Sequence, residues 1–123
     1  MLKLLLDEHI SPRVADGLRR RNPKAAVYSM REWQDGRFLG QGDEVLLQEA
    51  AIQRLSLVTY DRRTIPAILK LWIEEGRSHG GVIFVDEKTI APSDIGGLIR
   101  ALIELVRQGG EWDWRDLVVF LQL

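Results

Sequence analysis

The sequence predicts an α/β fold, in the form of a three-layer α/β/α domain with a mostly parallel sheet of four to five strands. Short apolar segments alternate along the chain with stretches that carry helix-start residues and helical spacing. The apolar segments are nearly continuous in hydrophobicity, which is typical of parallel strands buried on both faces. We expect right-handed crossovers between the strands, with an antiparallel last strand at one edge as the alternative.

The first strand and the first helix are indicated by the opening residues. Residues 2–6 (LKLLL) form an apolar run that Asp7 ends, so we expect a short buried strand there. Ser11 followed by Pro12 predicts a helix start, because serine caps free N–H groups and proline lacks one. This helix is expected to end near residues 22–23.

The middle of the chain continues the alternation. Residues 25–30 (AAVYSM) predict a second strand, and the polar, glycine-containing residues 31–42 predict a loop or a broken helical turn. Asp43 is the expected cap of a second helix. Residues 55–60 (LSLVTY) predict a third strand that Asp61 follows.

The second half of the chain predicts two more helices and two more strands. The expected elements are a helix from Thr64 to about Glu75, a strand over 81–85 that Asp86 stops, a helix from Pro92 to about Arg107, and a strand over 117–121.

Length, composition and charge set the class of protein. The 123 residues predict one domain over 1–123, and 46% hydrophobic with 28% charged residues is an ordinary globular balance. A net charge of −1 argues against nucleic-acid binding by bulk charge but permits a local basic patch. The absence of cysteine excludes thiolate metal sites and cysteine nucleophiles. We expect a cytoplasmic protein with no membrane segment and no targeting signal.

Acidic residues follow three of the expected strands and begin one helix. They are Asp7, Asp61 and Asp86 after strands, and Asp43 with Glu44 at the helix start. Parallel strands end at one edge of a sheet, so these carboxylates are expected to meet there. Crowded carboxylates repel one another unless some are protonated or a cation lies among them. Mg²⁺ and Mn²⁺ prefer such oxygen ligands and activate water for attack on a phosphodiester.

Each acid also has a simpler interpretation as a turn or cap residue. Asp43 is the most cap-like, which favours Glu44 as the inward ligand, although either acid fits. Asp86 has the weakest case, since DEKT is also a typical solvated turn.

Cations near these acids are candidates for phosphate contacts, because arginine binds phosphate oxygens in pairs. The candidates are Arg62, Arg63, Arg31, Arg37 and His9. A solvated surface is the alternative for all of them. Trp33, in the polar loop, is a candidate platform for base stacking, whereas Trp72 is expected to pack in the core.

Three segments together resemble a known family. LLLDEHISPR at 4–13, GDEVLLQEAA at 42–51 and LVTYDRRTIP at 57–66 resemble the small PIN-like domains related to VapC-type toxins. The resemblance implies a PIN-type sheet and a Mg²⁺- or Mn²⁺-dependent endoribonuclease, the toxin of a toxin–antitoxin pair. Asp7 and Asp61 match the family's strand-end acids, Asp43-Glu44 its helix-borne acid, and Asp86 its later acid.

The resemblance also implies partners. Single-stranded or looped RNA is the expected substrate. A protein antitoxin and a second copy of the chain are further expected partners, and the apolar carboxyl-terminal segment is suited to a homodimer.

Two other functions fit the same residues. Asp7-Glu8 after the first strand and Asp61 after the third are also typical of a phospho-accepting receiver-like domain. That class places a hydroxyl at the end of the fourth strand and a lysine at the end of the fifth, and this chain has neither at those positions. The third interpretation is a binding module on a PIN-like scaffold whose metal site has decayed.

Overall fold

The fold is α/β, as the sequence predicts, and the computed structural model describes residues 1–123. Its strands are β1 (Lys3–Leu6), β2 (Ala26–Ser29), β3 (Ser56–Thr59), β4 (Val82–Val85) and β5 (Val118–Leu121). Its helices are α1 (Pro12–Arg21), α2 (Asp43–Gln53), α3 (Thr64–Glu74) and α4 (Ile95–Gly109), with a short 3₁₀ turn, η1 (Trp33–Gly36), between β2 and α2.

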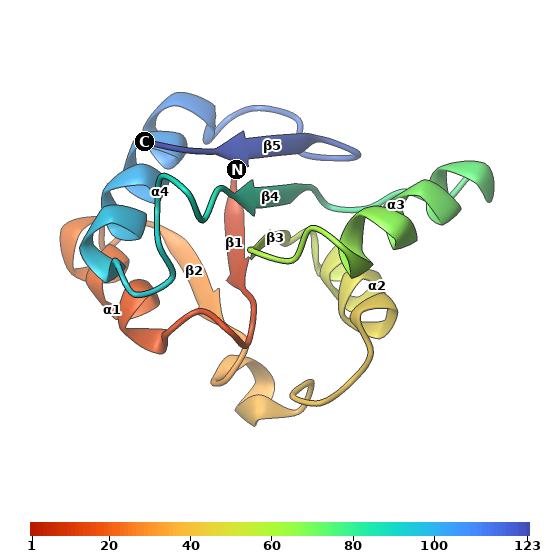
Figure 1. Cartoon of the computed structure of the whole chain (residues 1–123), viewed down its shortest axis with the longest axis horizontal. Helices are drawn as coiled ribbons and strands as arrows, with labels where there is room; N and C mark the ends of the chain where they lie inside the picture. Colours follow the sequence, from red (N-terminus) through yellow and green to blue (C-terminus); the bar gives the residue numbers. More distant parts are fainter.

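All five strands are parallel and lie in the order β2-β1-β3-β4-β5. Figure 1 shows the sheet between α1 and α4 on one side and α2 and α3 on the other. Successive strand residues point to opposite faces, so Leu4 and Leu6 pack with α1 and α4 whereas Leu5 packs with α2 and α3. The domain therefore has three layers and a core on each face of the sheet. None of its helices is long and apolar enough to cross a membrane.

The last crossover differs from the other three in its hand. The chain moves one way along the sheet from β1 to β2, and the opposite way from β2 to β3, from β3 to β4 and from β4 to β5. α1 covers one face while α2 and α3 cover the other, so these three crossovers share one hand. α4 returns to the face of α1, which reverses the hand of its crossover and departs from the uniform winding expected. As a result, no helix covers β5 on the face of the sheet where α3 lies.

Two helix starts differ in detail from the sequence prediction. The Ser11 hydroxyl accepts a hydrogen bond from the Arg13 N–H at 3.2 Å, as expected of a cap. α4, by contrast, begins at Ile95 rather than at Pro92, because the Asp94 carboxylate accepts a hydrogen bond from the Gly97 N–H at 2.9 Å. Asp43 is not a cap: it is the first residue of α2 and makes no capping hydrogen bond.

The loop before α2 buries its tryptophan. Trp33 is only 7% exposed and stacks on Phe38, with ring centroids 5.0 Å apart. Gln34 and Asp35 both have positive φ, which turns the chain back so that the indole faces the core. The expectation that Trp33 offers an open platform for a base is therefore wrong. Trp72 is buried in the core, as predicted.

Candidate active site

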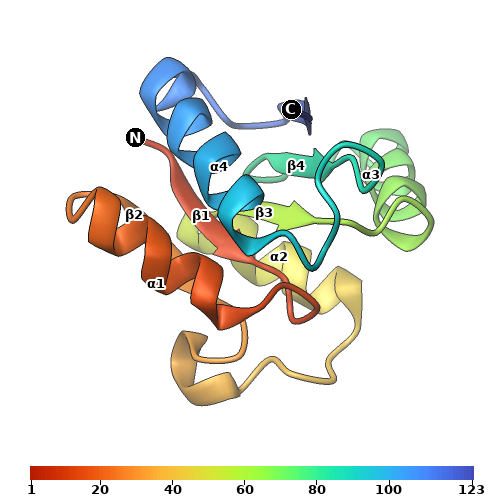
Figure 2. The same ribbon diagram turned by 60° about the vertical axis from the view of Figure 1, so that its left-hand side comes forward.

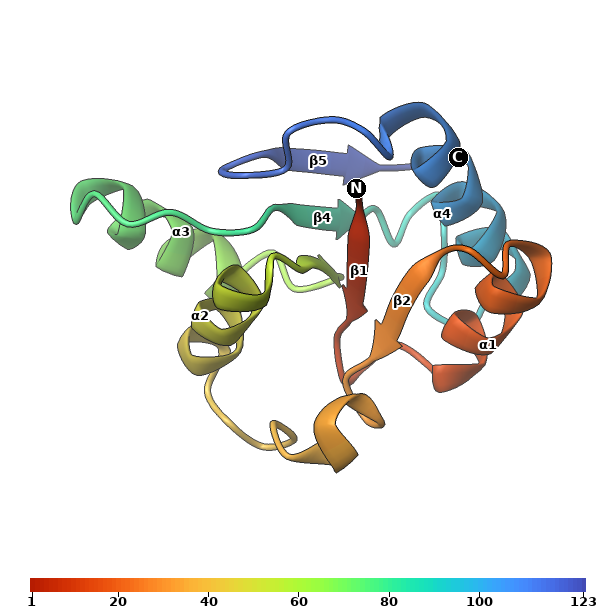
Figure 3. The same ribbon diagram turned by 180° about the vertical axis from the view of Figure 1, so that it is seen from behind.

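The ends of β1 and β3 lie at the point where the sheet changes direction. From β1 the chain leaves toward one edge of the sheet, and it returns past β1 to form β3. α1 follows β1 and α3 follows β3, and these two helices lie on opposite faces of the sheet, as Figures 2 and 3 show from two sides. In open parallel sheets this arrangement leaves a crevice outside the carboxyl ends of the two strands. Leu6 lies opposite Val58, so Asp7 and Thr59 come next to each other at the crevice.

The Thr59 hydroxyl joins the ends of the two strands. It donates a hydrogen bond to Asp7 Oδ2 at 2.5 Å and accepts one from the Asp61 N–H at 3.0 Å. Its side chain has no contact with solvent, with an exposed fraction of 0%. Buried polar groups require such partners, so the hydroxyl fixes the Asp7 carboxylate and the backbone at Asp61 together. The sequence prediction assigned no role to Thr59, although it lies in the threonine-x-aspartate pattern of the third resembling segment.

Further hydrogen bonds orient the two strand-end acids. Asp7 Oδ1 accepts from the His9 N–H at 2.7 Å. Asp61 Oδ1 accepts from the Arg63 and Thr64 N–H groups at 2.8 and 2.9 Å, at the start of α3. The second oxygen of Asp61 makes no hydrogen bond within the chain. Asp61 is thus a turn former, as the simpler interpretation expected, and also presents a free carboxylate oxygen beside Asp7.

Asp43 is the helix-borne acid that shares this environment. Its carboxyl group is partly buried and makes no hydrogen bond within the chain. Burial raises the pKa of Asp43 above its ordinary value, and the negative charges of Asp61, Asp7 and Glu8 raise it further, while His9 opposes them. Asp43 therefore shares the electrostatic environment of Asp7 and Asp61, the two acids that Thr59 links directly.

Glu44 lies outside this group, contrary to the preference from the sequence. Its Oε1 accepts hydrogen bonds from Arg77 at 3.2 Å and from the Trp72 indole at 3.4 Å. The Arg77 guanidinium lies 4.1 Å from the Trp72 ring centroid, which completes a separate surface contact. The structure therefore favours Asp43 over Glu44 as the inward acid.

Asp86 lies on the other side of Asp61. The two line a cleft of about 420 Å³ together with Arg62 and Arg63. Asp86 Oδ1 accepts a hydrogen bond from the Lys88 N–H at 3.0 Å, the turn contact that the simpler interpretation predicted. Asp86 is not among the charges that act on Asp43. It is a neighbour of the acidic group rather than a member of it.

The candidate cations are distributed unevenly around the acids. Arg62 and Arg63 line the cleft beside Asp61, and the Arg62 guanidinium lies 5.5 Å from the ring centroid of Phe120. Arg31 Nε donates to the Glu8 carbonyl at 2.9 Å, which holds it close to the turn after β1. Arg37 instead lies over the Phe38 ring, at 5.7 Å. His9 acts on the charge of Asp43 and so lies within the group.

The chemistry of the carboxylate donors fits a hard divalent cation, although the side chains do not surround a single metal position. No three acidic or histidine side chains lie close enough to enclose a metal ion as they stand. The available donors are carboxylate oxygens, which Mg²⁺ and Mn²⁺ prefer, and burial followed by the repulsion of neighbouring carboxylates raises the pKa of Asp43. Mg²⁺ commonly uses one or two carboxylates and keeps several waters, so it does not require a closed cage.

Comparisons of the chain with protein-family models, with curated proteins and with solved structures found no match.

Proposed function

We propose that the chain is a Mg²⁺- or Mn²⁺-dependent ribonuclease of the PIN-like type. The observation that supports it is the hydroxyl of Thr59, which links Asp7 to Asp61 at the switch point of the sheet, where both charges also act on Asp43. No serine nucleophile motif or cysteine competes with this group as a catalyst.

In this proposal Asp7, Asp43 and Asp61 hold the cation, and Asp86 is an outer partner. The bound cation supplies a water nucleophile and neutralises charge on the phosphodiester. The Thr59 hydroxyl and the His9 N–H keep the Asp7 carboxylate in one orientation. Orientation of this kind lowers the entropy cost of reaching the reactive geometry.

The remaining side chains have roles that follow from their positions. Arg62 and Arg63 line the cleft next to Asp61 and bind phosphate oxygens of the substrate, with Arg31 and His9 on the opposite side.

Single-stranded or looped RNA is the proposed substrate, because its unstacked backbone can enter a cleft lined by arginines. A protein antitoxin that covers the cleft is the corresponding partner.

The test is cleavage of end-labelled single-stranded RNA with Mn²⁺, Mg²⁺ or chelator. Asp7→Asn, Asp43→Asn and Asp61→Asn should each lower the rate by about 100-fold or more, the range for loss of an electrostatic catalytic group. Glu44→Gln is the matched control, because it changes the adjacent acid on the same helix, and its rate should stay within about twofold of the parent. Equal rates for the parent and Asp61→Asn would overturn the proposal.

A receiver-like domain is the second candidate, favoured by one observation. The strand order β2-β1-β3-β4-β5 also occurs in phospho-accepting receivers, with acids at the ends of β1 and β3. Here β4 ends in Val85-Asp86 without a hydroxyl, and β5 has no lysine. Incubation with acetyl phosphate and Mg²⁺ separates the two functions, because only a receiver would form an acyl phosphate on Asp61. RNA binding that survives both chelation and loss of Asp61, without cleavage, would instead indicate a decayed binding module.

A further inference from the structure

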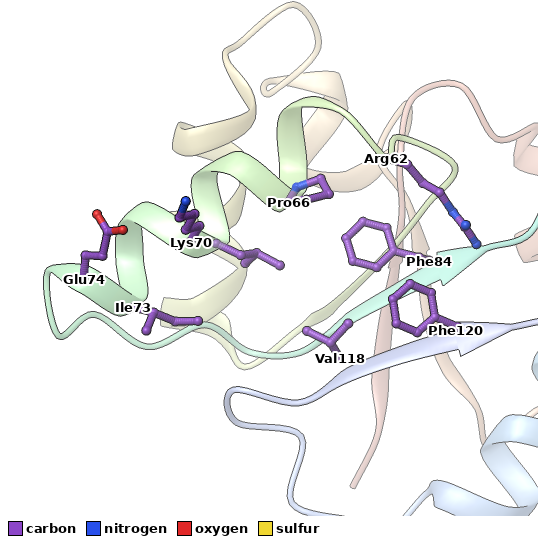
Figure 4. A pocket seen from close by; sticks show the side chains of 9 residues that line it. Arg62, Pro66, Lys70, Ile73, Glu74, Phe84, Val118 and Phe120 are labelled. Carbon is purple, nitrogen blue, oxygen red and sulfur yellow. The ribbon is translucent and has the colours of Figure 1, made fainter.

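One face of β5 is uncovered and forms an apolar groove with α3. Its floor is Phe84, Val118 and Phe120, and its wall is Pro66, Leu69 and Ile73, around a volume of about 550 Å³ (Figure 4). Phe120 is 63% exposed and Ile73 is 74% exposed, although both are large apolar side chains. The groove exists because α4 crosses the opposite face of the sheet. Contiguous exposed apolar surface of this kind marks an interaction site.

The outer edge of β5 is also free. The carbonyls of Leu117 and Leu121 accept hydrogen bonds from β4, so by alternation the backbone groups of Val118 and Phe120 point away from the sheet. The loop between α4 and β5 passes above β5 in Figures 1 and 3, but it makes no backbone hydrogen bond to these two residues.

The opposite edge of the sheet, formed by β2, is protected against pairing with another strand, unlike the β5 edge. There Arg19 Nη2 donates to the Val27 carbonyl of β2 at 2.8 Å, so a charged side chain occupies that edge. β5 carries no charge and no proline, the devices that usually prevent edge pairing. We infer that β5 pairs with another strand when the protein is in solution.

The sequence of β5 identifies the partner. Residues 117–121 read Leu-Val-Val-Phe-Leu, a fully apolar segment whose residue types are nearly symmetric about Val119. A segment of this kind is complementary to itself when reversed, which is the requirement for a two-fold interface. We propose that a second copy of this chain pairs antiparallel with β5, with the two-fold axis at Val119, to form a continuous ten-stranded sheet. This proposal is independent of the nuclease proposal.

This register pairs every apolar residue of the segment with another. Val118 lies opposite the partner's Phe120, and Leu117 lies opposite the partner's Leu121. The Val118 and Phe120 backbones form the hydrogen-bonded pairs, and aromatic residues beside β-branched ones are favourable cross-strand neighbours. A shift by two residues would place Phe120 or Val118 opposite a polar residue, Asp116 or Gln122, so the symmetric register buries the most apolar surface.

The charges at the ends of the groove fit the same symmetry. Arg62 lies at the end near Phe120, and Glu74 lies at the far end of α3 (Figure 4). A two-fold rotation places the Arg62 end of one groove beside the partner's Glu74. The end charges are then opposite in sign on each side of the interface, with Lys70 between them on α3, and this favours antiparallel over parallel pairing.

The sharpest test uses single cysteines, since the chain has none of its own. In the proposed register the two Val119 Cα atoms form a non-hydrogen-bonded pair about 4.5 Å apart, within disulfide range. Val119→Cys should therefore form a covalent dimer under mild oxidation. Val118→Cys and Phe120→Cys are matched controls, because each lies diagonally from its own copy at about 7–8 Å and should cross-link poorly. Equal cross-linking at all three positions, or none at Val119→Cys, overturns this register.

Sedimentation equilibrium measures the association itself. The parent should show a concentration-dependent monomer–dimer equilibrium, and Phe120→Lys should weaken it by about tenfold or more, since a charge would be buried at the interface. Ile52→Lys, at an exposed apolar residue of α2 outside the groove, is the control and should leave the dimer unchanged. A parent that stays monomeric up to millimolar concentration, or a dimer that Phe120→Lys leaves intact, contradicts the proposal. So does binding of a different protein to β5 without self-association.

Discussion

At the scale of single residues, the candidate site depends on one buried hydroxyl. The Thr59 hydroxyl donates a hydrogen bond to Asp7 and accepts one from the Asp61 N–H, so the side chain connects two residues that are 54 positions apart in the sequence. A carboxylate held by a hydroxyl and a backbone N–H has little freedom to rotate. Thr59 is a positioning residue: it acts through the acids and need not touch the substrate.

Replacing this hydroxyl should separate positioning from simple packing. Thr59→Val keeps the shape of the side chain but leaves a partly buried N–H and a partly buried carboxylate oxygen without their partner, which should lower the free energy of unfolding by about 1–3 kcal/mol. Cleavage should fall as well. Thr59→Ser restores the hydroxyl and should recover most of the activity while losing a methyl group. Urea denaturation and the cleavage assay measure both effects; a Val variant as active as the Ser variant would show that the hydroxyl only supports packing.

Asp43 should make stability depend on pH. Burial and the neighbouring Asp61, Asp7 and Glu8 raise its pKa in the folded chain above the unfolded value. The unfolded chain therefore releases this proton at lower pH than the folded chain does. The contribution of the Asp43 carboxyl group to the free energy of unfolding is complete below about pH 4 and is lost as pH rises through the pKa of the folded chain. Asp43→Asn, which cannot ionise, should be more stable than the parent at pH 7 and approach it near pH 3.

Chemical denaturation at several pH values measures this difference. If Asp43→Asn is more stable than the parent by the same amount at pH 3 and pH 7, the increase comes from the position of this residue at the start of α2 and not from carboxylate repulsion.

At the scale of elements, local sequence patterns predict the strands and most helix ends, but they do not predict the direction in which helix side chains point. Strand ends are marked by Asp7 and Asp61 directly after apolar runs, so their meeting could be predicted from the parallel fold. On a helix, adjacent residues point about 100° apart, and the sequence alone does not fix the rotation of the helix about its axis. The choice between Asp43 and Glu44 was therefore decided by tertiary contacts, namely the Arg77 and Trp72 side chains that hold Glu44.

The loop that carries Trp33 shows a second limit. Its polar composition and glycines correctly predict irregular structure, but they do not show that Gln34 and Asp35 adopt positive φ. Non-glycine residues rarely take that conformation, so local preference argues against it. The gain from burying the Trp33 ring against Phe38 offsets the strain.

At the scale of the whole molecule, the sheet order explains both surfaces of interest. The reversal of chain direction between β1 and β3 brings Asp7 and Asp61 to one crevice, where their charges also act on Asp43. The reversed hand of the last crossover leaves β5 without a helix on its α3 side. The first consequence could be predicted from alternating strands and helices. The second could not, because a right-handed crossover is the general expectation for every parallel pair.

The gathered carboxylates should couple global stability to divalent cations. A ligand that binds only the folded chain stabilises it by about 2.7 kcal/mol when its concentration is 100 times its Kd, which corresponds to a rise in Tm of about 10 °C for a domain of this size. Mg²⁺ or Mn²⁺ should therefore raise the Tm of the parent, measured by calorimetry at constant ionic strength with KCl as the control. Asp7→Asn and Asp61→Asn should lose the shift, while Glu44→Gln should keep it. Because this readout needs no RNA, it tests the cation site apart from catalysis; an equal shift in parent and variants would place the cation elsewhere on the molecule.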